Sequence, residues 1–376
     1  MHCWIELSRE ALLHNYAVFM EMAGVNQVIP VLKSNAYGHG LEEIYGLLKE
    51  AKPPWIGVTY TEEARNLRQL GYQGRLINLG PVSTLDISES RSIDLEVLLG
   101  DEVSLEAWKK LSPSKRPKLH VKVDTGLSRR GFSLEQLEAV FAGLKGLDED
   151  VVGLATHLAN VEDVTNTDFA HSQLNLFLRA TKMAKDLGFE KLLTHCSSSA
   201  STLIIKEPKF DLHRVGISLY GLWPSDKTRL SFFAFPSKPD IFLRPVLSWK
   251  TLISSVRELP EGAFVGYGCT FKASRKMKIA VIPVGYYEGY PRLAAVRGAY
   301  VIVQGKRCPI VGRICMNMAM IDLENLRDVQ VGDTVTLLGR DGAEEVSAEQ
   351  IAQWADTINY EVVTRLNPRI PRRITP

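Results

Sequence analysis

A lysine ends the first strongly apolar run of this chain, and residues that break regular structure follow it. Residues 28–32 are Val-Ile-Pro-Val-Leu, Lys33 comes next, and Asn35, Gly38 and Gly40 follow. Such a run is typical of a buried parallel strand, and α/β enzymes place reactive groups where those strands end. Lysine is also the side chain that forms Schiff bases with carbonyl compounds. A lone lysine after a strand is most often a solvated loop residue, so Lys33 needs support from the rest of the chain.

Polar side chains follow several other apolar runs in the same way. They are Lys122 with Arg129 shortly after it, His157, His195, Ser199 and Arg214. If the runs are parallel strands, their carboxyl ends share one rim, which is where the active sites of parallel barrels lie. Taken singly, each is more often structural, such as an arginine paired with a carboxylate or a histidine satisfied in the core. Several together favour an active site.

Ser199 and the backbone of Gly216 and Ile217 are suited to bind a phosphate group. Glycine allows the backbone to approach an anion closely, and backbone N–H groups donate to it. An ordinary turn between a strand and a helix is the alternative. We expect no metal at His157 and His195, because no cysteine or carboxylate stands at ligand spacing from them.

A second group of candidates lies on glycine-containing loops in the last third of the chain. Tyr267 stands between two glycines, Tyr286 lies in the segment Gly-Tyr-Tyr-Glu-Gly-Tyr, and Arg313 and Met316 lie in a third loop. Glycine gives such loops a flexible backbone. Taken alone, these tyrosines are usually turn residues or packing aromatics, so their role depends on the other motifs.

Size and composition exclude several classes of protein. At 376 residues the chain is long for a single core and suits two domains. A net charge of +2 without a basic stripe gives no reason to expect nucleic acid as a partner. The charged first ten residues do not match a signal peptide, and no apolar stretch has the length of a membrane span. Five scattered cysteines without a CxxC pair are typical of reduced thiols, so we expect a cytoplasmic protein.

Eight short apolar runs alternate with amphipathic segments between residue 28 and about residue 221. The runs are residues 28–33, 55–60, 76–80, 95–99, 119–124, 151–157, 192–197 and 215–220, and helices are expected at 41–52, 61–70, 105–111, 134–144 and 168–187. This alternation predicts a parallel sheet, and eight strands are the number that closes a (β/α)8 barrel of the TIM type. An open, doubly wound sheet is the alternative, because strands can be miscounted from one sequence.

The composition changes after this region. Residues 223–244 are rich in Pro, Ser, Phe and charged residues, which is typical of a connection between domains. Beyond them, strands are expected at 246–256, 279–285, 299–304, 318–323 and 334–338, with one helix at 348–357. This pattern predicts a mainly antiparallel β domain. We therefore expect an α/β protein with a barrel at residues 11–235 and a β-rich domain at 236–376, with which residues 1–10 pair.

The segment Lys-Ser-Asn-Ala-Tyr-Gly-His-Gly at residues 33–40 closely resembles the lysine segment of the alanine racemase family, and the other motifs follow in the family's order. The resemblance covers nearly the whole chain, from Trp4 to the Pro-Arg near the C-terminus. It implies a (β/α)8 barrel plus a β domain that use pyridoxal 5′-phosphate (PLP). Lys33 would carry PLP, and Tyr267 would reach the same cofactor from the partner subunit of a homodimer with shared active sites.

The resemblance also implies a role for each site residue. Lys33 would move the α-proton on the D-substrate side and Tyr267 on the L-substrate side, because racemisation exchanges protons on both faces of the Cα. His157 and Arg214 would tune Tyr267, and Arg214 would also hydrogen-bond the pyridine nitrogen. The remaining implied roles are phosphate binding by Tyr37, Ser199, Gly216 and Ile217, substrate binding by Arg129 and the backbone of Met316, support of Arg129 by a carbamylated Lys122, and an entrance formed by Tyr286 and Arg313.

Two positions depart from the family's pattern. Asn317 stands where the family usually has aspartate, so a carboxylate near the substrate is missing. Pro368 stands where the family has a tyrosine that helps to bind phosphate and narrows the entrance. Because proline has no hydroxyl, the entrance must be built differently. These differences bear on the substrate range more than on the class of reaction.

We expect a PLP-dependent racemase that interconverts L- and D-alanine, a reaction that in bacteria supplies D-alanine for peptidoglycan. A broader-specificity or serine-preferring racemase on the same scaffold is the nearest alternative, and Pro368 favours it. A barrel-type PLP decarboxylase would leave the Tyr267 loop without a purpose. A PLP carrier without enzymatic activity would resemble the barrel alone.

Overall fold

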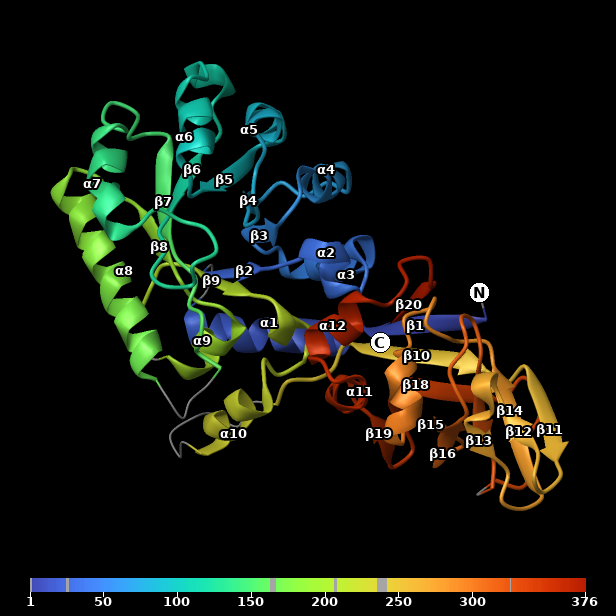
Figure 1. Cartoon of the computed structure of the whole chain (residues 1–376). Coiled ribbons are helices and arrows are strands. Elements are labelled where there is room, and N and C mark those ends of the chain that lie inside the picture. Colours follow the sequence, from blue (N-terminus) through green and yellow to red (C-terminus); the bar gives the residue numbers. More distant parts are fainter. Residues whose placement is uncertain (1, 25–26, 163–166, 206–207, 235–241, 325) are drawn as a thin grey trace. The chain divides into compact units, whose positions relative to one another are not determined.

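The computed structural model describes residues 2–24, 27–162, 167–205, 208–234, 242–324 and 326–376. The chain divides into two compact units, whose elements are labelled in Figure 1. The barrel unit comprises residues 12–36 and 44–244, and the β unit comprises residues 1–11, 37–43 and 245–376. The predicted boundary between residues 235 and 236 lies outside the described residues.

In the described residues of the barrel unit, eight parallel strands close into a ring. They are β2 (Val28–Pro30), β3 (Trp55–Val58), β4 (Arg75–Asn78), β5 (Leu95–Leu99), β6 (Leu119–Lys122), β7 (Val151–Ala155), β8 (Leu193–His195) and β9 (His213–Val215). Strands β3 to β8 form one sheet in chain order, and β2 pairs with β9. Single bridges join Val31 to Gly57 and Ser197 to His213, which close both gaps. The predicted barrel is therefore confirmed, and the open doubly wound sheet is wrong.

Helices alternate with these strands. They are α1 (Arg9–Ala23), α2 (Lys33–Tyr37), α3 (Leu41–Leu48), α4 (Thr61–Gln69), α5 (Thr84–Ser90), α6 (Glu102–Lys109), α7 (Leu134–Ala142), α8 (Asp168–Asp186), α9 (Ser199–Ile204) and α10 (Asp226–Ala234). Side-chain caps fix several starts, as where the Asp101 carboxylate accepts the Ser104 N–H at 2.8 Å before α6. Helix α10 lies in the segment that the sequence predicted to be a connection.

The last barrel strand differs from its prediction. The apolar run 215–220 was expected to be a strand, but β9 ends at Val215 and residues Ile217–Tyr220 form the 3-10 helix η4. The backbone turns at Gly216, whose φ and ψ are −102° and −101°. Apolarity alone does not separate a short buried helix from a buried strand. The consequence is that Gly216 and Ile217 stand directly after a strand end.

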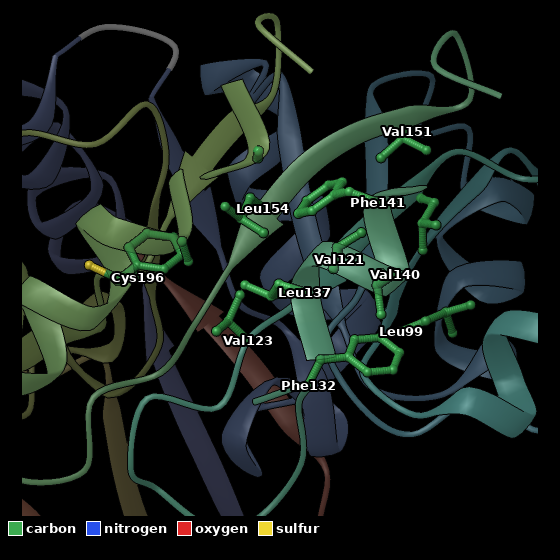
Figure 2. Packing of buried hydrophobic residues seen from close by; sticks show 14 of the residues in the cluster. Leu99, Val121, Val123, Phe132, Leu137, Val140, Phe141, Val151, Leu154 and Cys196 are labelled. Atoms are coloured by element: carbon green, nitrogen blue, oxygen red, sulfur yellow. The ribbon is translucent and has the colours of Figure 1, made fainter. Parts of the chain in front are cut away.

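A large hydrophobic cluster of the barrel unit lies between strands β5–β8 and the helices that cover them. Figure 2 shows side chains of β6, β7 and α7 gathered there, including Val121, Leu154, Leu137 and Phe141. Helix α8 contributes Phe177 and other residues to the same cluster. Burying apolar area of this kind is the main favourable term in folding, and it holds the strand ends in register.

The β unit is built on one large sheet. Its strand order is β11-β14-β17-β16-β15-β18-β10-β1-β20, with β19 paired to β18 and a separate pair β12-β13. The strands are β1 (Cys3–Ser8), β10 (Leu247–Leu252), β11 (Ser255–Leu259), β12 (Phe264–Val265), β13 (Phe271–Lys272), β14 (Met277–Ile282), β15 (Tyr300–Val303), β16 (Lys306–Val311), β17 (Ala319–Asp322), β18 (Thr334–Asp341), β19 (Glu344–Val346) and β20 (Arg372–Thr375). Nearly all pairs are antiparallel, and β1 pairs with β10 and, in parallel, with β20. Two helices, α11 (Ala348–Ala355) and α12 (Asn359–Thr364), complete the unit.

The sequence analysis was incomplete in the β unit. The run 246–256, predicted as one strand, contains all of β10 and the start of β11. The strands β12, β13, β16, β19 and β20 and helix α12 were not predicted. Strand β16 carries lysine, arginine and proline and is half exposed, and β20 begins with two arginines. Such strands lack the apolar alternation from which a strand is recognised.

Within the part of the chain that the structure describes, no helix has the length and apolar character needed to cross a membrane.

Candidate active site

Lys33 follows β2 at the carboxyl end of the barrel, and the backbone around it is held on both sides. The Leu32 N–H donates to the Gly57 carbonyl at 2.8 Å, and the Ser34 N–H donates to the Glu63 carboxylate at 2.6 Å. Residues 34–37 all have φ between +52° and +56°, which is a left-handed turn. Non-glycine residues adopt this conformation rarely, and such strain concentrates at functional sites.

Glu63 is a site residue that the sequence analysis missed. Its carboxylate accepts the N–H groups of Ser34, Thr59 and Tyr60, the last two at 2.9 and 3.2 Å. It thereby joins the start of α4 to the turn that follows Lys33. Acidic residues are common in the first turn of a helix, so nothing in the sequence distinguished Glu63 from an ordinary helix-start residue.

The surroundings of Lys33 favour its uncharged form. Burial lowers the pKa of the Lys33 amine, the positive charges of Arg129 and Arg214 lower it further, and the Glu63 carboxylate acts in the opposite direction. An amine must be uncharged to act as a nucleophile or to accept a proton. The strand end therefore presents a lysine that is more reactive at neutral pH than one in water.

Arg214, which is buried on β9, is held by backbone carbonyls and imidazoles. Its guanidinium donates to the carbonyls of His195, Thr156 and Cys196 at 2.9, 2.8 and 3.1 Å. It also donates to Nδ1 of His195 and, at 3.3 Å, to Nδ1 of His157. Burial lowers its pKa to about 10, so that it stays protonated at neutral pH. No carboxylate is among these partners, and its charge therefore remains available to a bound group.

His157 is a neutral imidazole in this setting. Burial, followed by the charge of Arg214, lowers its pKa to about 3. Because Arg214 has only donors, Nδ1 of His157 accepts, and the ring proton resides on Nε2. The structure thus places the two predicted tuning residues, His157 and Arg214, in direct contact.

Lys122 and Arg129 lie on β6 and the loop after it. Burial, then the charges of Arg129, Arg214 and Arg130, lowers the pKa of Lys122 to about 8. With Lys33, these residues form a group of positive charges at one rim of the barrel. The positive charges here outweigh the carboxylates of Glu63 and Asp124, so that the rim is suited to bind anions, such as a phosphate and a substrate carboxylate.

The predicted phosphate residues meet at the start of α9 and η4. The hydroxyl of Ser199 accepts the N–H groups of Gly216 and Ser218 at 3.0 and 3.3 Å. Ile217 follows Gly216 and begins η4. These N–H groups point to one place, where a phosphate oxygen would take the position that the Ser199 hydroxyl oxygen occupies in this structure. Among the described residues, no cluster of His, Cys, Asp or Glu has the composition of a metal site.

The β unit brings Tyr267 and Arg313 onto neighbouring loops. Tyr267 follows Gly266 in the 3-10 helix η5 (Tyr267–Cys269), and its side chain is 70% exposed. A Cβ on Gly268 would lie 2.9 Å from Nη1 of Arg313, and φ at Gly268 is +73°. The positive φ at both Gly266 and Gly268 is therefore what favours glycine on the two sides of Tyr267, and the Arg313 side chain packs close to Gly268.

Tyr286 and Met316 are joined by backbone hydrogen bonds in the same unit. The Tyr286 N–H donates to the Cys315 carbonyl at 3.2 Å, and the Tyr287 N–H donates to the Met316 carbonyl at 2.9 Å. A Cβ on Gly285 would lie 2.1 Å from the Cys315 carbonyl oxygen, so that only glycine permits this approach. The second group of predicted residues thus lies on adjacent loops of the β unit.

Asn317 has a neutral amide where a carboxylate was expected, and this amide is hydrogen-bonded to Glu288. Its amide donates to the Glu288 carboxylate at 2.8 Å, and the other oxygen of Glu288 accepts the Gly285 N–H at 2.8 Å. The carboxylate of this loop region is therefore supplied by Glu288, which is buried. The amide and acid pair ties the Asn317 loop to the Tyr286 loop.

Pro368 lies in a loop that is anchored by Arg372. The Arg372 guanidinium donates to the carbonyls of Pro368, Ile370 and Asn367 at 2.8, 2.6 and 3.3 Å, and to that of Gly38 at 2.8 Å. Tyr37, another predicted phosphate ligand, lies in the same unit with its ring centroid 6.3 Å from that of Tyr360. The loop is thus held by its backbone, without the tyrosine hydroxyl that the family usually has.

Comparisons with known proteins agree along the whole chain. The family descriptions "Alanine racemase, N-terminal domain" and "Alanine racemase, C-terminal domain" match residues 7–224 and 246–374. An alanine racemase from Leptospira interrogans is 38% identical over 372 residues, which cover 98% of this chain and 95% of that protein. The crystal structure of alanine racemase from Bacillus anthracis with bound L-Ala-P has a TM-score of 0.91 at 31% identity, covering 100% of this chain and 95% of that one. A histidine racemase from Leuconostoc mesenteroides subsp. sake has a TM-score of 0.87 at 28% identity, covering 100% and 98%.

Proposed function

The chain belongs to the alanine racemase family, whose members depend on PLP, and we propose that it interconverts L- and D-alanine with Lys33 and Tyr267 as its two proton-transfer groups. The observation that carries this proposal is the position of Lys33. Its amine lies just after a barrel strand and has a lowered pKa, because burial and the positive charges of Arg129 and Arg214 outweigh the effect of the Glu63 carboxylate. A lysine in this state is suited both to bond a carbonyl group and to move a proton.

The described residues fit PLP in each of its chemical parts. The Lys33 amine suits its aldehyde, and the N–H groups that converge at Ser199 suit its phosphate. Arg214 is held with its charge uncompensated and suits the pyridine nitrogen. When bound, PLP withdraws electrons from the amino acid and makes the α-proton acidic. The protein must then hold the amino acid and move that proton.

Arg214 determines how strongly the cofactor can draw electrons. The guanidinium can donate a hydrogen bond but keeps its own proton at neutral pH, even with a pKa of about 10. The pyridine nitrogen therefore remains largely unprotonated and draws electrons less strongly. This limit favours simple proton exchange over transamination, which suits a racemase.

Two groups are needed because racemisation removes a proton from one face of the Cα and returns one to the other. Lys33 serves one face and Tyr267 the other. The 70% exposed Tyr267 side chain in the single chain suits a residue that reaches into a partner subunit. We therefore include in the proposal a homodimer with shared active sites. Arg129 and the Met316 backbone would hold the substrate carboxylate, and Tyr286 and Arg313 would line the entrance.

The free thiols of all five cysteines suit a reducing compartment, and we propose a cytoplasmic enzyme that supplies D-alanine for peptidoglycan. The match of the second family description to residues 246–374 supports an enzyme over a PLP carrier made of a barrel alone. The Tyr267 loop likewise supports a racemase over a decarboxylase, which has no use for a second proton donor on the opposite face.

We expect alanine to be racemised faster than larger or more polar amino acids. Circular dichroism of pure L-alanine, L-serine, L-lysine and L-histidine should show L-alanine fastest in kcat/KM by at least about tenfold, a range typical of pocket discrimination. Serine or histidine in first place would support the broader-specificity alternative. Pro368→Tyr should lower the rate for the larger substrates more than that for alanine, and Pro368→Ala serves as its matched control.

We also expect Lys122 to react with CO2. At a pKa of about 8, roughly one Lys122 amine in ten is uncharged at pH 7, and this fraction rises with pH. The carbamate would be an anion beside Arg129, Arg130 and Arg214. With ¹³C-labelled CO2 held at fixed concentration, the carbamate NMR signal should increase between pH 7 and pH 8. Lys122→Gln should abolish the signal, whereas Lys118→Gln should leave it; persistence in Lys122→Gln would assign the carbamate elsewhere.

A further inference from the structure

A continuous chain of buried hydrogen bonds links Arg214 to Glu96 through two histidines. Nη1 of Arg214 donates to Nδ1 of His195, and Nε2 of His195 lies 3.0 Å from Nδ1 of His120. Nε2 of His120 lies 2.7 Å from the Glu96 carboxylate. The groups come from β9, β8, β6 and β5, and both imidazoles have no solvent exposure. None of His195, His120 and Glu96 has a task in the proton exchange described above.

The direction of every bond in this chain is fixed by its two ends. Arg214 has only donors, so that Nδ1 of His195 must accept and the proton of His195 must be on Nε2. That proton is donated to Nδ1 of His120, whose own proton must then be on Nε2. It is donated to the Glu96 carboxylate, which only accepts. A positive donor at one end and a negative acceptor at the other thus select one tautomer for each histidine.

The surroundings of Glu96 favour its ionised carboxylate form although the residue is buried. Although burial acts to raise its pKa, hydrogen bonds from His120 and Arg75 lower the pKa overall. Nε and Nη2 of Arg75 donate to its two oxygens at 2.5 and 3.0 Å. The Arg75 guanidinium in turn stacks on the Trp55 ring, with 3.8 Å to the ring centroid. Glu96 is therefore held by Arg75 as well as by His120.

The barrel makes room for the central imidazole. His120 pairs across the sheet with Gly153, and a Cβ on Gly153 would lie 1.9 Å from Nδ1 of His120. Gly153 has no positive φ that would by itself require glycine. Glycine at this position thus leaves room for the imidazole of His120, which links His195 to Glu96.

From this geometry we infer that Glu96 is a positioning residue for the racemase reaction, which sets the tautomers of His120 and His195 and thereby helps to hold the Arg214 guanidinium in its orientation. The inference rests on the proposed function for its kinetic consequence only. The tautomers are a property of the protein itself. Charge at the end of a buried hydrogen-bond chain strengthens the other bonds in it. Glu96 thus helps to keep the guanidinium in the orientation that limits transamination.

Glu96→Gln tests this inference with little change in shape. With the amide oxygen kept on Nε of Arg75, which makes the shorter of the two Arg75 bonds, the amide N–H₂ would face Nε2 of His120, and Nη2 of Arg75, which shares that position, would lose its acceptor. His120 would then have to carry its proton on Nδ1, and the reversal would pass to His195, where two donors would face each other at Arg214. We expect kcat for alanine to fall at least about tenfold with KM within about twofold, and the ratio of transamination to racemisation to change.

The decisive readout is the ¹⁵N NMR spectrum of histidine-labelled protein, with His120→Gln and His195→Gln used for assignment. Wild type should show both rings protonated at Nε2 and unprotonated at Nδ1. Glu96→Gln should change the nitrogen shifts of both rings, and Gly153→Ala should displace His120 with the same effect. Either ring found protonated at Nδ1 in the wild type would overturn the inference even if no variant folds.

Asp150→Asn provides a matched control for the loss of an ion pair near the same strands. Asp150 accepts from Arg116 at 3.2 Å and from Lys118 at 3.1 Å, and it is not part of the histidine chain. The Asp150→Asn variant should have a lower melting temperature than wild type, with unchanged ¹⁵N shifts of the histidine rings and unchanged kcat. If Glu96→Gln behaves as Asp150→Asn does, Glu96 has a structural role alone and the inference is wrong. An inactive wild type with the expected tautomers would contradict the proposed function and leave the chain of bonds intact.

Discussion

Lys33→Ala should abolish alanine racemisation, with a loss of about four orders of magnitude or more in kcat, because one residue supplies both the bond to the cofactor and one of the two bases. The protein should still fold, since Lys33 is only partly buried and follows β2 without being part of it. Wild type reduced with borohydride should carry the cofactor on the peptide that contains Lys33. The variant should lack the visible absorbance of a lysine-bound cofactor.

Lys182→Ala is a suitable control for Lys33→Ala. Lys182 lies on the exposed surface of α8 and pairs with Asp186 at 2.6 Å. An exposed pair of this kind contributes little to stability, so that this variant should keep full activity and full absorbance. A reduced cofactor found on a peptide without Lys33, or wild-type activity in Lys33→Ala, would remove the lysine from the mechanism and with it the proposed function.

Mixing two inactive variants, Lys33→Ala and Tyr267→Phe, should restore activity. In a mixed dimer one site has the lysine of one subunit and the tyrosine of the other, whereas the second site lacks both. If subunits exchange at random, half of the dimers are mixed and each has one intact site, so that recovery should approach about a quarter of wild type. Each variant alone should remain inactive. Activity during exchange is followed by circular dichroism, and native mass spectrometry reports the fraction of mixed dimers.

The control for this mixing experiment is a chain that carries both substitutions. Mixed with Lys33→Ala, the double variant offers no complete site, and no activity should return. Recovery in that mixture would indicate contamination or a base other than Lys33. If mixed dimers form but stay inactive in the main experiment, both groups come from the same chain, and the shared site is wrong while the racemase proposal stands.

Much of the barrel followed from the sequence because its signals are local. Eight apolar runs predicted the strands, the last of them only in part, and the amphipathic segments between them predicted helices α3, α4, α6, α7 and α8. The rule that parallel strands share one functional rim placed Lys33, Lys122, His157 and Arg214 together. The glycines beside Tyr267 likewise indicated a loop. These predictions rest on burial, periodicity and backbone freedom, which neighbouring residues determine.

Tertiary structure decided which side chains that are distant in sequence come into contact, and whether each of them is charged. Closure of the eight strands, with a specific register between them, brings Glu96, His120, His195 and Arg214 into one chain of hydrogen bonds. Burial among like charges, which no local pattern reports, gives Lys33 its lowered pKa. Local sequence patterns thus determined the secondary-structure elements and the types of functional side chain that these elements carry. Packing alone decided their partners and protonation, because hydrogen bonds and electrostatic shifts depend on distances of a few ångströms between residues far apart in sequence.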